Sequence, residues 1–335
     1  MKYTAFGKTG LRVSQVALGT GNFGTGWGYG ADPDASKAVF EAYAEAGGNF
    51  IDTADIYQFG QSEEQLGLLL QGRREDFVLA TKFTNGAVPN ADRLVTGNSR
   101  KALVASVEAS LKRLKTDRID IYWAHHPDGV TPIEEIVRGF EDLARSGKIL
   151  YAGLSNFSAW RLSRAVTLAE LTHAVPIAAA QFEHSLVHRN PEADLFPASH
   201  ALGLGIVTWS PLGGGMLTGK YRKGEQGRAE GFGGRVFQPE NSEQRTQTLD
   251  TVLAIADELG VNAGQVAIAW AGTHGAVPII GPRSLTQLTD NLAALELELS
   301  TEQIARLDAV SSLDPSVPAR KTVAWASGDI PRIIA

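Results

Sequence analysis

Three stretches in the first half of the chain decide its fold: Asn-Phe-Ile-Asp-Thr-Ala at residues 49–54, Asp-Phe-Val-Leu-Ala-Thr-Lys-Phe at 76–83 and Ile-Asp-Ile-Tyr-Trp-Ala-His at 119–125. Each is a short, largely apolar run that ends on or near a side chain able to hold a charge or a proton. Such runs are typical of strands buried on both faces of a parallel sheet. In a barrel of parallel strands the carboxyl ends share one rim, and active sites are built there.

Five further runs of the same kind bring the expected strands to eight, at 16–19, 49–53, 77–82, 119–125, 150–155, 178–183, 205–210 and 277–281. Helix-period segments lie between them, for example at 35–46, 99–114, 132–146 and 158–170. Each is long enough to serve as a crossover. The pattern therefore predicts an α/β fold, a (β/α)8 TIM barrel forming one domain over residues 1–335. A β-hairpin is expected before the barrel, over 2–13 with its turn at 7–10.

A long loop is expected after the seventh strand, at residues 212–243, where nine glycines and several charges lie. No break in composition there suggests a linker between domains. Long glycine-rich βα loops cover active sites or form mobile surface more often than they mark a domain boundary. We interpret this segment as a cover.

Composition excludes several classes of protein. Hydrophobic residues make up 43% and charged residues 20% of the 335 residues, as in a water-soluble protein with a large core. A formal charge of -6 argues against nucleic-acid binding. The chain has no cysteine, which excludes disulfides and thiolate catalysis and suits a reducing compartment. With no signal-peptide pattern and no apolar stretch of ~20 residues, a cytoplasmic protein without a membrane partner is expected.

The rim of the predicted barrel carries four residues suited to proton and hydride chemistry: Asp52, Tyr57, Lys82 and His125. Tyr57 is the candidate general acid, although a phenol has an unperturbed pKa of about 10. The ammonium of Lys82 can favour the phenolate, and Asp52 can keep Lys82 charged and oriented. His125 can orient a carbonyl oxygen or share its proton. No metal site is expected among them.

The sequence around these residues resembles the aldo-keto reductase family. The signature begins with Phe-Ile-Asp-Thr-Ala-Asp-Ile-Tyr at 50–57, followed by Gly-Gln-Ser-Glu at 60–63 and Leu-Gly at 66–67. It continues in order through 81–82, 120–128, Gly-Leu-Ser-Asn at 153–156, Gln181, Trp-Ser-Pro-Leu at 209–212 and Leu-Thr-Gly-Lys-Tyr at 217–221. It ends with Gly-Pro-Arg-Ser at 281–284, Gln287 and Asp-Asn at 290–291. The resemblance covers nearly the whole chain.

The resemblance implies a barrel reductase that passes a hydride from NADPH, or from NADH, to an aldehyde or ketone as its small-molecule substrate. Asp52, Tyr57, Lys82 and His125 would be its catalytic tetrad. Ser155, Asn156 and Gln181 would hold the nicotinamide carboxamide, and Trp209 would support the ring. Arg283 would meet the 2′-phosphate through its fork of donors, near the N-terminus of a helix that begins after Ser284. The remaining cofactor contacts implied are Ser210, Leu212, Gly281, Gln287 and Asn291.

Two residues depart from the pattern of the family. Trp209 replaces a tyrosine often found before Ser-Pro-Leu, and Gln58 stands where a glycine commonly follows the catalytic tyrosine. Both are expected to reshape the substrate and nicotinamide sides of the pocket. Five further side chains are candidates for the pocket lining or for the core: Phe23, Trp27, Phe59, His126 and Trp160.

The sequence also offers three other interpretations. Gly19 to Gly24 matches the dinucleotide fingerprint GxGxxG, but the glycine-rich residues 25–30 that follow are a poor helix start, so we expect a substrate-side loop. His125 and His126 suggest a metallohydrolase, but neighbours on a strand point to opposite faces. The third alternative is a cofactor-binding regulatory subunit with little turnover, since potassium-channel β-subunits resemble aldo-keto reductases.

Overall fold

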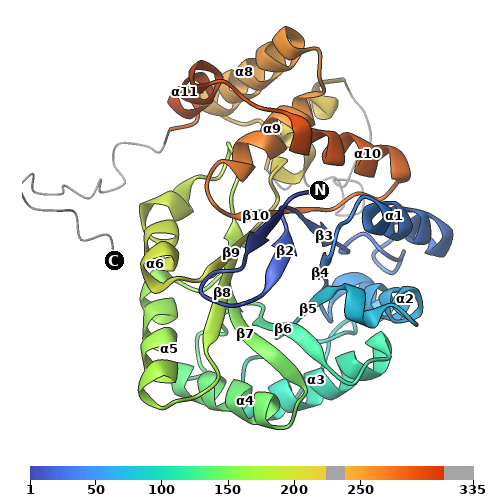
Figure 1. Ribbon diagram of the computed structural model, residues 1–335, viewed down its shortest axis with the longest axis vertical. Coiled ribbons are helices and arrows are strands. Elements are labelled where there is room, and N and C mark those ends of the chain that lie inside the picture. Colours follow the sequence, from blue (N-terminus) through green and yellow to red (C-terminus); the bar gives the residue numbers. More distant parts are fainter. Residues whose placement is uncertain (224–237, 313–335) are drawn as a thin grey trace, which may run out of the picture.

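A closed barrel of eight parallel strands forms the centre of the molecule, in a computed structural model that describes residues 1–223 and 238–312 (Figure 1). The strands follow chain order around the ring, and β10 closes it by pairing with both β9 and β3. Their bounds are β3 Ala17–Gly19, β4 Phe50–Asp52, β5 Val78–Phe83, β6 Ile119–Ala124, β7 Ile149–Ser155, β8 Ile177–Glu183, β9 Gly205–Trp209 and β10 Val277–Ile280. The predicted (β/α)8 barrel is confirmed.

Helices surround the ring and connect its strands. They are α1 Pro33–Glu45, α2 Gln61–Leu69, α3 Arg100–Leu114, α4 Ile133–Arg145, α5 Ala159–Leu171, α6 Leu195–Leu202, α8 Glu243–Leu259, α9 Ala263–Gly272, α10 Leu285–Ala293 and α11 Thr301–Val310. Their starts follow ordinary capping chemistry: the Asp32 side chain accepts from the amide of Ala35, and Ser99 caps α3 in the same way. The four helices expected at 35–46, 99–114, 132–146 and 158–170 differ from the observed ones by no more than two residues at either end.

The predicted hairpin is also present, as β1 Tyr3–Ala5 and β2 Arg12–Ser14, paired antiparallel. It lies across one end of the ring, the end where the strands begin (Figure 1). Phe6 and Val13 from this hairpin join the apolar cluster that fills the barrel interior, and the Phe6 ring meets that of Phe50 edge to face at 5.6 Å. The hairpin therefore closes the end of the barrel that faces away from the strands' carboxyl ends.

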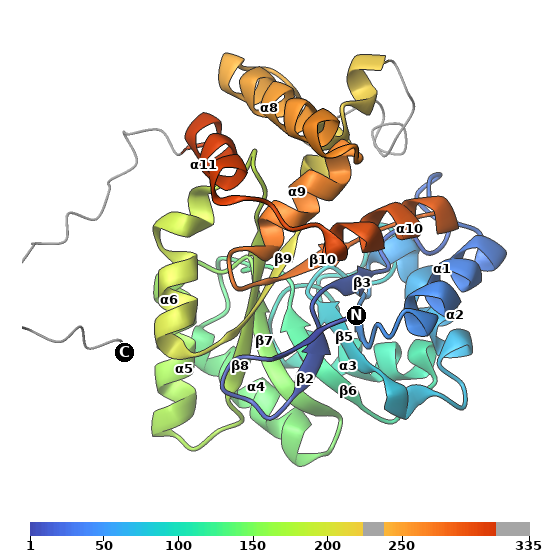
Figure 2. The ribbon, with the colours of Figure 1, turned by 45° about the horizontal axis from the view of Figure 1, so that its top comes forward.

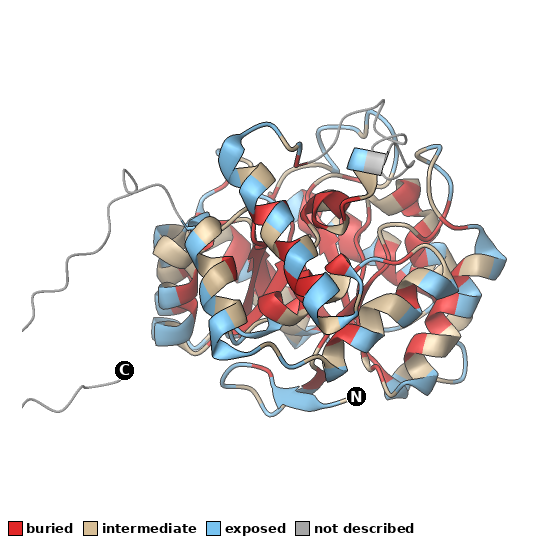
Figure 3. Cartoon of the chain, turned by 90° about the horizontal axis from the view of Figure 1, so that it is seen from above, coloured by how far each residue is buried: buried red, intermediate tan, exposed pale blue. Residues whose placement is uncertain are grey.

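Buried residues are concentrated in the strands and on the helix faces turned toward them (Figure 3). A second apolar cluster joins α8, α9 and α11, which gather on one side of the barrel (Figure 2). Within the described residues no single helix is long and apolar enough to cross a membrane; α8 and α9 reach that length only as a pair bent by 102°.

The loop expected at 212–243 is only partly irregular. Its first half contains the 3-10 helices η4 Gly213–Thr218 and η5 Lys220–Lys223, and α8 begins at its end. Residues 224–237, where five of its nine glycines lie, are outside the described residues. The prediction that this segment covers the active site is therefore not tested.

Candidate active site

Inward-facing side chains change from apolar to polar where the strands end. On β5, Val78 and Ala80 belong to the interior cluster, and Lys82 is the next residue on the same side, because alternate residues of a strand share a face. The corresponding inward positions at the ends of other strands are held by Asp52, Gln181 and Trp209, and His125 follows directly after β6. Parallel pairing brings these side chains to one rim, as the sequence predicted.

Lys82 is the centre of the site and is completely buried. Its ammonium donates to the Oδ1 atom of Asp52, to the backbone carbonyl of Thr53 at 2.8 Å and to the hydroxyl of Tyr57 at 3.2 Å. All three donors of the ammonium are thereby used. Burial opposes the charge, but Asp52 and Tyr57 outweigh it and raise the pKa of Lys82 above its usual value. The amine is therefore held as a cation against the phenol oxygen.

Asp52 is fixed from its other side by an amide. The Nε2 atom of Gln181 on β8 donates to Oδ2 of Asp52 at 2.9 Å. A buried carboxylate needs hydrogen bonds at both oxygens, and here Lys82 and Gln181 supply them. Gln181, predicted as a cofactor contact, thus also orients the tetrad.

His125 is buried and neutral. Burial, followed by the charge of Lys82 and the neighbouring His126, holds the pKa of His125 well below its usual value. The amide nitrogen of Asn85 lies 3.1 Å from Nδ1 of His125. Because an amide nitrogen only donates, Nδ1 accepts and Nε2 carries the ring hydrogen. Sequence reasoning missed Asn85, whose only signal was its place three residues after Lys82.

The predicted carboxamide-binding residues converge on the same rim. Asn156 follows β7 in a left-handed conformation with φ of 62°, which asparagine tolerates better than most residues. Its Nδ2 atom lies 2.9 Å from the carbonyl of His125 and 3.0 Å from Oγ of Ser155, and its Oδ1 accepts from Nε1 of Trp209 at 3.1 Å. The structure therefore brings Ser155, Asn156 and Trp209 together beside His125.

His125 and His126 do not point to opposite faces, and this prediction is wrong. Their rings stack with centroids 4.4 Å apart and planes 12° apart. The reason is that β6 ends at Ala124, one residue earlier than expected, so the alternation of a strand no longer applies.

The other predicted cofactor contacts lie at β9, β10 and α10. The guanidinium of Arg283 stacks on the ring of Tyr29 at 4.7 Å, and the backbone amide of Arg283 donates to the side chain of Gln287. Ser284 caps α10, and Gln287 and Asn291 lie one turn apart on that helix.

The carbonyl of Gly281 accepts from the side chain of Asn22 at 2.7 Å. Ser210, with φ of 64°, accepts from the amide of Gly214.

Aromatic side chains flank Tyr57 at the mouth of the barrel. The ring of Tyr57 meets Trp27 at 6.0 Å and His125 at 5.9 Å, both edge to face, and Trp27 also meets Phe59 at 6.4 Å. Two other candidates for the pocket lie elsewhere. Phe23 is fully buried in the apolar cluster between the barrel strands and the surrounding helices, and Trp160 on α5 is 68% exposed. Leu212 is partly buried and packs against both the apolar cluster around the barrel and the cluster formed by α8, α9 and α11.

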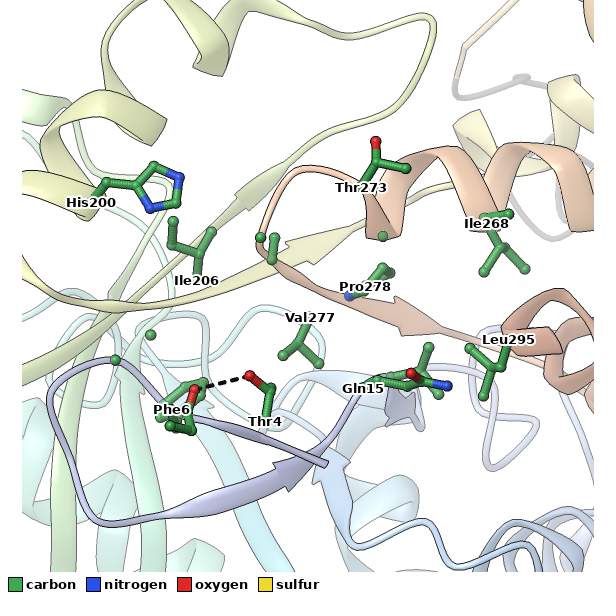
Figure 4. Close-up of a pocket in the computed structure, with 18 of the residues that line it drawn as sticks. Thr4, Phe6, Gln15, His200, Ile206, Ile268, Thr273, Val277, Pro278 and Leu295 are labelled. Carbon is green, nitrogen blue, oxygen red and sulfur yellow. Dashed lines mark hydrogen bonds between the residues drawn. The ribbon is translucent and has the colours of Figure 1, made fainter. Parts of the chain in front are cut away.

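A cavity of about 820 Å³ opens at the opposite end of the molecule (Figure 4). It lies between the hairpin and the starts of β9 and β10, and its labelled lining includes Phe6, Ile206, Val277 and Pro278. The tetrad lies at the other end of the strands, so this cavity takes no part in the arrangement described above.

A group of His184, Glu192 and His274 has the composition of a metal site, with ligand atoms within 4.8 Å of one another. However, Arg189 donates to both carboxylate oxygens of Glu192 at 2.7 Å, and His184 donates to one of them at 2.8 Å. The charge of Glu192 is already balanced by a guanidinium that would repel a cation. This group is better described as an ion-pair network between the β8–α6 segment and the residues that follow α9.

Comparison with known proteins agrees with the geometry. Residues 15–312 match the model of the aldo/keto reductase family. The chain is 38% identical to an uncharacterised oxidoreductase, YrpG, of Bacillus subtilis, over 92% of this chain and 95% of that protein. It is 36% identical to a probable voltage-gated potassium channel subunit beta of rice, over 94% and 98%. It is 33% identical to a putative aryl-alcohol dehydrogenase, AAD14, of Saccharomyces cerevisiae, over 92% and 86%.

The barrel and these likenesses define the class of the protein as an NAD(P)H-dependent oxidoreductase. The match to the family model extends over most of the chain, from the start of the barrel to the end of α11. The chain belongs to the aldo/keto reductase family.

Proposed function

We propose that the protein reduces an aldehyde or ketone with NADPH, or catalyses the reverse oxidation of an alcohol, with Tyr57 as the general acid. The observation that supports this most directly is the buried ammonium of Lys82 between Asp52 and the hydroxyl of Tyr57. A phenol that gives up its proton leaves a phenolate, and a cation 3.2 Å away stabilises it. Asp52 keeps that cation charged.

His125 completes the proton-transfer site. Since Asn85 occupies Nδ1, the hydrogen on Nε2 is free to donate to a carbonyl oxygen placed beside Tyr57. A neutral imidazole polarises the carbonyl without competing with Tyr57 for the role of acid. Two donors would then meet at one oxygen, where negative charge develops during reduction.

The donor set at the rim fits a nicotinamide cofactor. Ser155, Asn156 and Gln181 offer a hydroxyl and two amides, the groups that match a carboxamide, and Trp209 lies hydrogen-bonded to Asn156 beside them. At the far end Arg283 and the N-terminus of α10 suit a phosphate. The cofactor supplies the hydride when bound. The arginine favours NADPH, although NADH can use the remaining contacts.

Aromatic surroundings support an aromatic carbonyl compound as substrate. Trp27 and Phe59 border Tyr57, and the similar yeast protein is named for an aryl alcohol. The lack of cysteines in the sequence remains the reason to place the reaction in a reducing compartment, the cytoplasm.

Steady-state kinetics with nitrobenzaldehyde test the proposal. The wild-type protein should oxidise NADPH, and Tyr57→Phe should lower kcat by at least ~10²-fold, the usual effect of losing a general acid. Tyr3→Phe is the matched control, since the Tyr3 hydroxyl binds the carbonyl of Gly47 far from the rim. Full activity in Tyr57→Phe would remove Tyr57 from the mechanism.

The second candidate function is a cofactor-binding regulatory subunit with little turnover, which the similarity to the rice channel subunit supports. An enzyme and a regulatory subunit of this kind differ in the number of catalytic cycles that each protein molecule completes. Many cycles of NADPH oxidation per protein molecule favour the enzyme, whereas tight cofactor binding with a single slow oxidation favours the regulatory subunit.

A further inference from the structure

Gln58, the residue after the proposed general acid, has a backbone conformation that needs an explanation. Gln58 and Phe59 both adopt left-handed conformations, with φ of 53° and 55°. Such a conformation is unfavourable for residues other than glycine and persists only where the surroundings enforce it. Glutamine has no intrinsic tendency to adopt it, so the contacts of its side chain must matter.

Those contacts all go to one loop, residues 20–31 between β3 and α1. Gln58 is completely buried. Its Nε2 atom donates to the carbonyls of Gly21 and Tyr29, each at 3.0 Å, and its Oε1 accepts from the amide of Trp27 at 2.9 Å. The amide thus binds the backbone at the start, middle and end of the loop. These contacts add to the few backbone bonds of the loop itself, such as that from the amide of Gly24 to the carbonyl of Ala31.

The glycines of the loop are shaped around Gln58. A Cβ atom at Gly24 would lie 2.8 Å from Cβ of Gln58, and one at Gly26 would lie 2.5 Å from the Gln58 carbonyl oxygen. Gln61 adds a further anchor by accepting from the amides of Thr25 and Gly26. The loop and the turn after Tyr57 therefore form one fitted unit.

This unit places two aromatic rings. The Trp27 ring stands against Tyr57 and Phe59, and the Tyr29 ring lies under the guanidinium of Arg283. The amide of Trp27 and the carbonyl of Tyr29 are two of the three groups that Gln58 holds. The Gln58 side chain therefore binds the backbone of both residues whose rings stand beside Tyr57 and Arg283.

We propose that Gln58 is a positioning residue that holds the 20–31 loop so that Trp27 and Phe59 form an aromatic wall, and that this wall selects flat aromatic carbonyl compounds over small aliphatic ones. The inference rests on the proposed reductase activity. The Gln58 side chain is buried and binds only backbone groups of the loop. It acts through the loop backbone.

The test compares Gln58→Gly and Gln58→Asn with the wild type, using nitrobenzaldehyde and propanal. Glycine suits the left-handed backbone, so the first variant should fold, and asparagine keeps an amide one methylene too short to reach the loop. Both should raise KM for nitrobenzaldehyde about 2- to 10-fold relative to KM for propanal, the effect of a loosened aromatic contact. The loss should appear in KM rather than in kcat.

Two further variants sharpen the comparison. Trp27→Ala should cause the same loss of selectivity, and adding Gln58→Gly to it should cause little more, because the two residues act as one unit. Lys115→Gly is the matched control: Lys115 is exposed with φ of 52° at the end of α3, so the change relieves the same backbone strain without touching the loop. It should leave the selectivity unchanged.

Hydrogen exchange tests the same proposal without any turnover. Peptides covering residues 20–31 should exchange at least ~10-fold faster in Gln58→Gly than in the wild type. Three results would overturn the inference. They are unchanged protection of residues 20–31 in Gln58→Gly, a double variant whose loss of selectivity is the product of the two single losses, and equal losses with both carbonyl compounds. If the wild type reduces no carbonyl compound, the reductase proposal fails while the exchange result still decides the role of Gln58.

Discussion

At the scale of single residues, a buried ion pair stands beside Tyr57. Lys82 and Asp52 are fully buried and paired, an arrangement that stabilises a fold little, because desolvation cancels most of the attraction. Its value is chemical: it fixes a positive charge 3.2 Å from a phenol oxygen. Gln181 and Asn85, from other strands and loops, fix the carboxylate and the imidazole in turn.

Asp55 gives a prediction at this scale. Burial, with the nearby Glu63 adding to it, raises the pKa of Asp55 to about 7. The folded protein therefore favours the protonated acid, and its stability falls as pH rises from about 4, where the unfolded group ionises, to about 7. Since one pKa unit corresponds to 1.36 kcal/mol, the ionisation of Asp55 lowers the free energy of unfolding by about 4 kcal/mol over this pH range.

Asp55→Asn should remove that loss. The difference in free energy of unfolding between variant and wild type, from urea denaturation, should move in favour of the variant by several kcal/mol between pH 4 and pH 7, and then level off. Asp257→Asn, at an exposed carboxyl on α8, is the control and should show no such trend. A constant difference for Asp55→Asn would show that folding does not change the pKa of Asp55.

At the scale of elements, the strands from β4 to β9 carry the polar side chains of the site at or just beyond their carboxyl ends, and one helix contributes its N-terminus. The N-terminus of α10, capped by Ser284, follows directly after Arg283. Among the described residues Arg283 forms no salt bridge, and its guanidinium rests on Tyr29. A cation beside a helix N-terminus is an arrangement suited to phosphate.

Arg283→Ala should therefore raise KM for NADPH about 10-fold or more, the loss of a charge-assisted hydrogen bond, and raise KM for NADH far less. The loss of the Tyr29 contact affects both cofactors alike, so the ratio of the two KM values isolates the phosphate. Arg306→Ala, which breaks a surface pair with Glu258, is the control. Equal changes for both cofactors would dismiss the phosphate contact.

At the scale of the whole molecule, one end of the barrel is closed by apolar side chains and the other carries the polar side chains of the candidate active site. The hairpin closes the first with Phe6 and Val13, while the tetrad occupies the second. Stability and chemistry are thereby separated along the barrel axis, as expected for this fold.

Phe6→Ala tests the separation. Removing the buried ring should lower the free energy of unfolding by about 3–5 kcal/mol, while kcat/KM measured well below the unfolding temperature stays within about 2-fold of the wild type. Thr4→Ala, at an exposed position on β1, should change stability by no more than about 0.5 kcal/mol. A large loss of kcat/KM in folded Phe6→Ala would mean that the two ends are coupled.

Much of the architecture, and the placement of Asp52, Tyr57, Lys82 and His125 at one rim, could be predicted because both depend on local pattern. Short, nearly continuous apolar runs define the strands, and parallel pairing brings their ends to one rim. The predicted orientation of His126 was wrong because β6 ends one residue earlier than expected. Asn85 was missed because its partner, His125, is 40 residues away in the chain.

By itself the sequence determined that eight strands close into a barrel with Asp52, Tyr57, Lys82 and His125 at one rim, because alternation and strand direction follow from the order of residues. Only the tertiary structure decided which nitrogen of His125 carries hydrogen, how Gln181 holds Asp52, and that Gln58 fastens the 20–31 loop beside Tyr57. These depend on side-chain rotation and on contacts between segments distant in the chain, which no local pattern encodes.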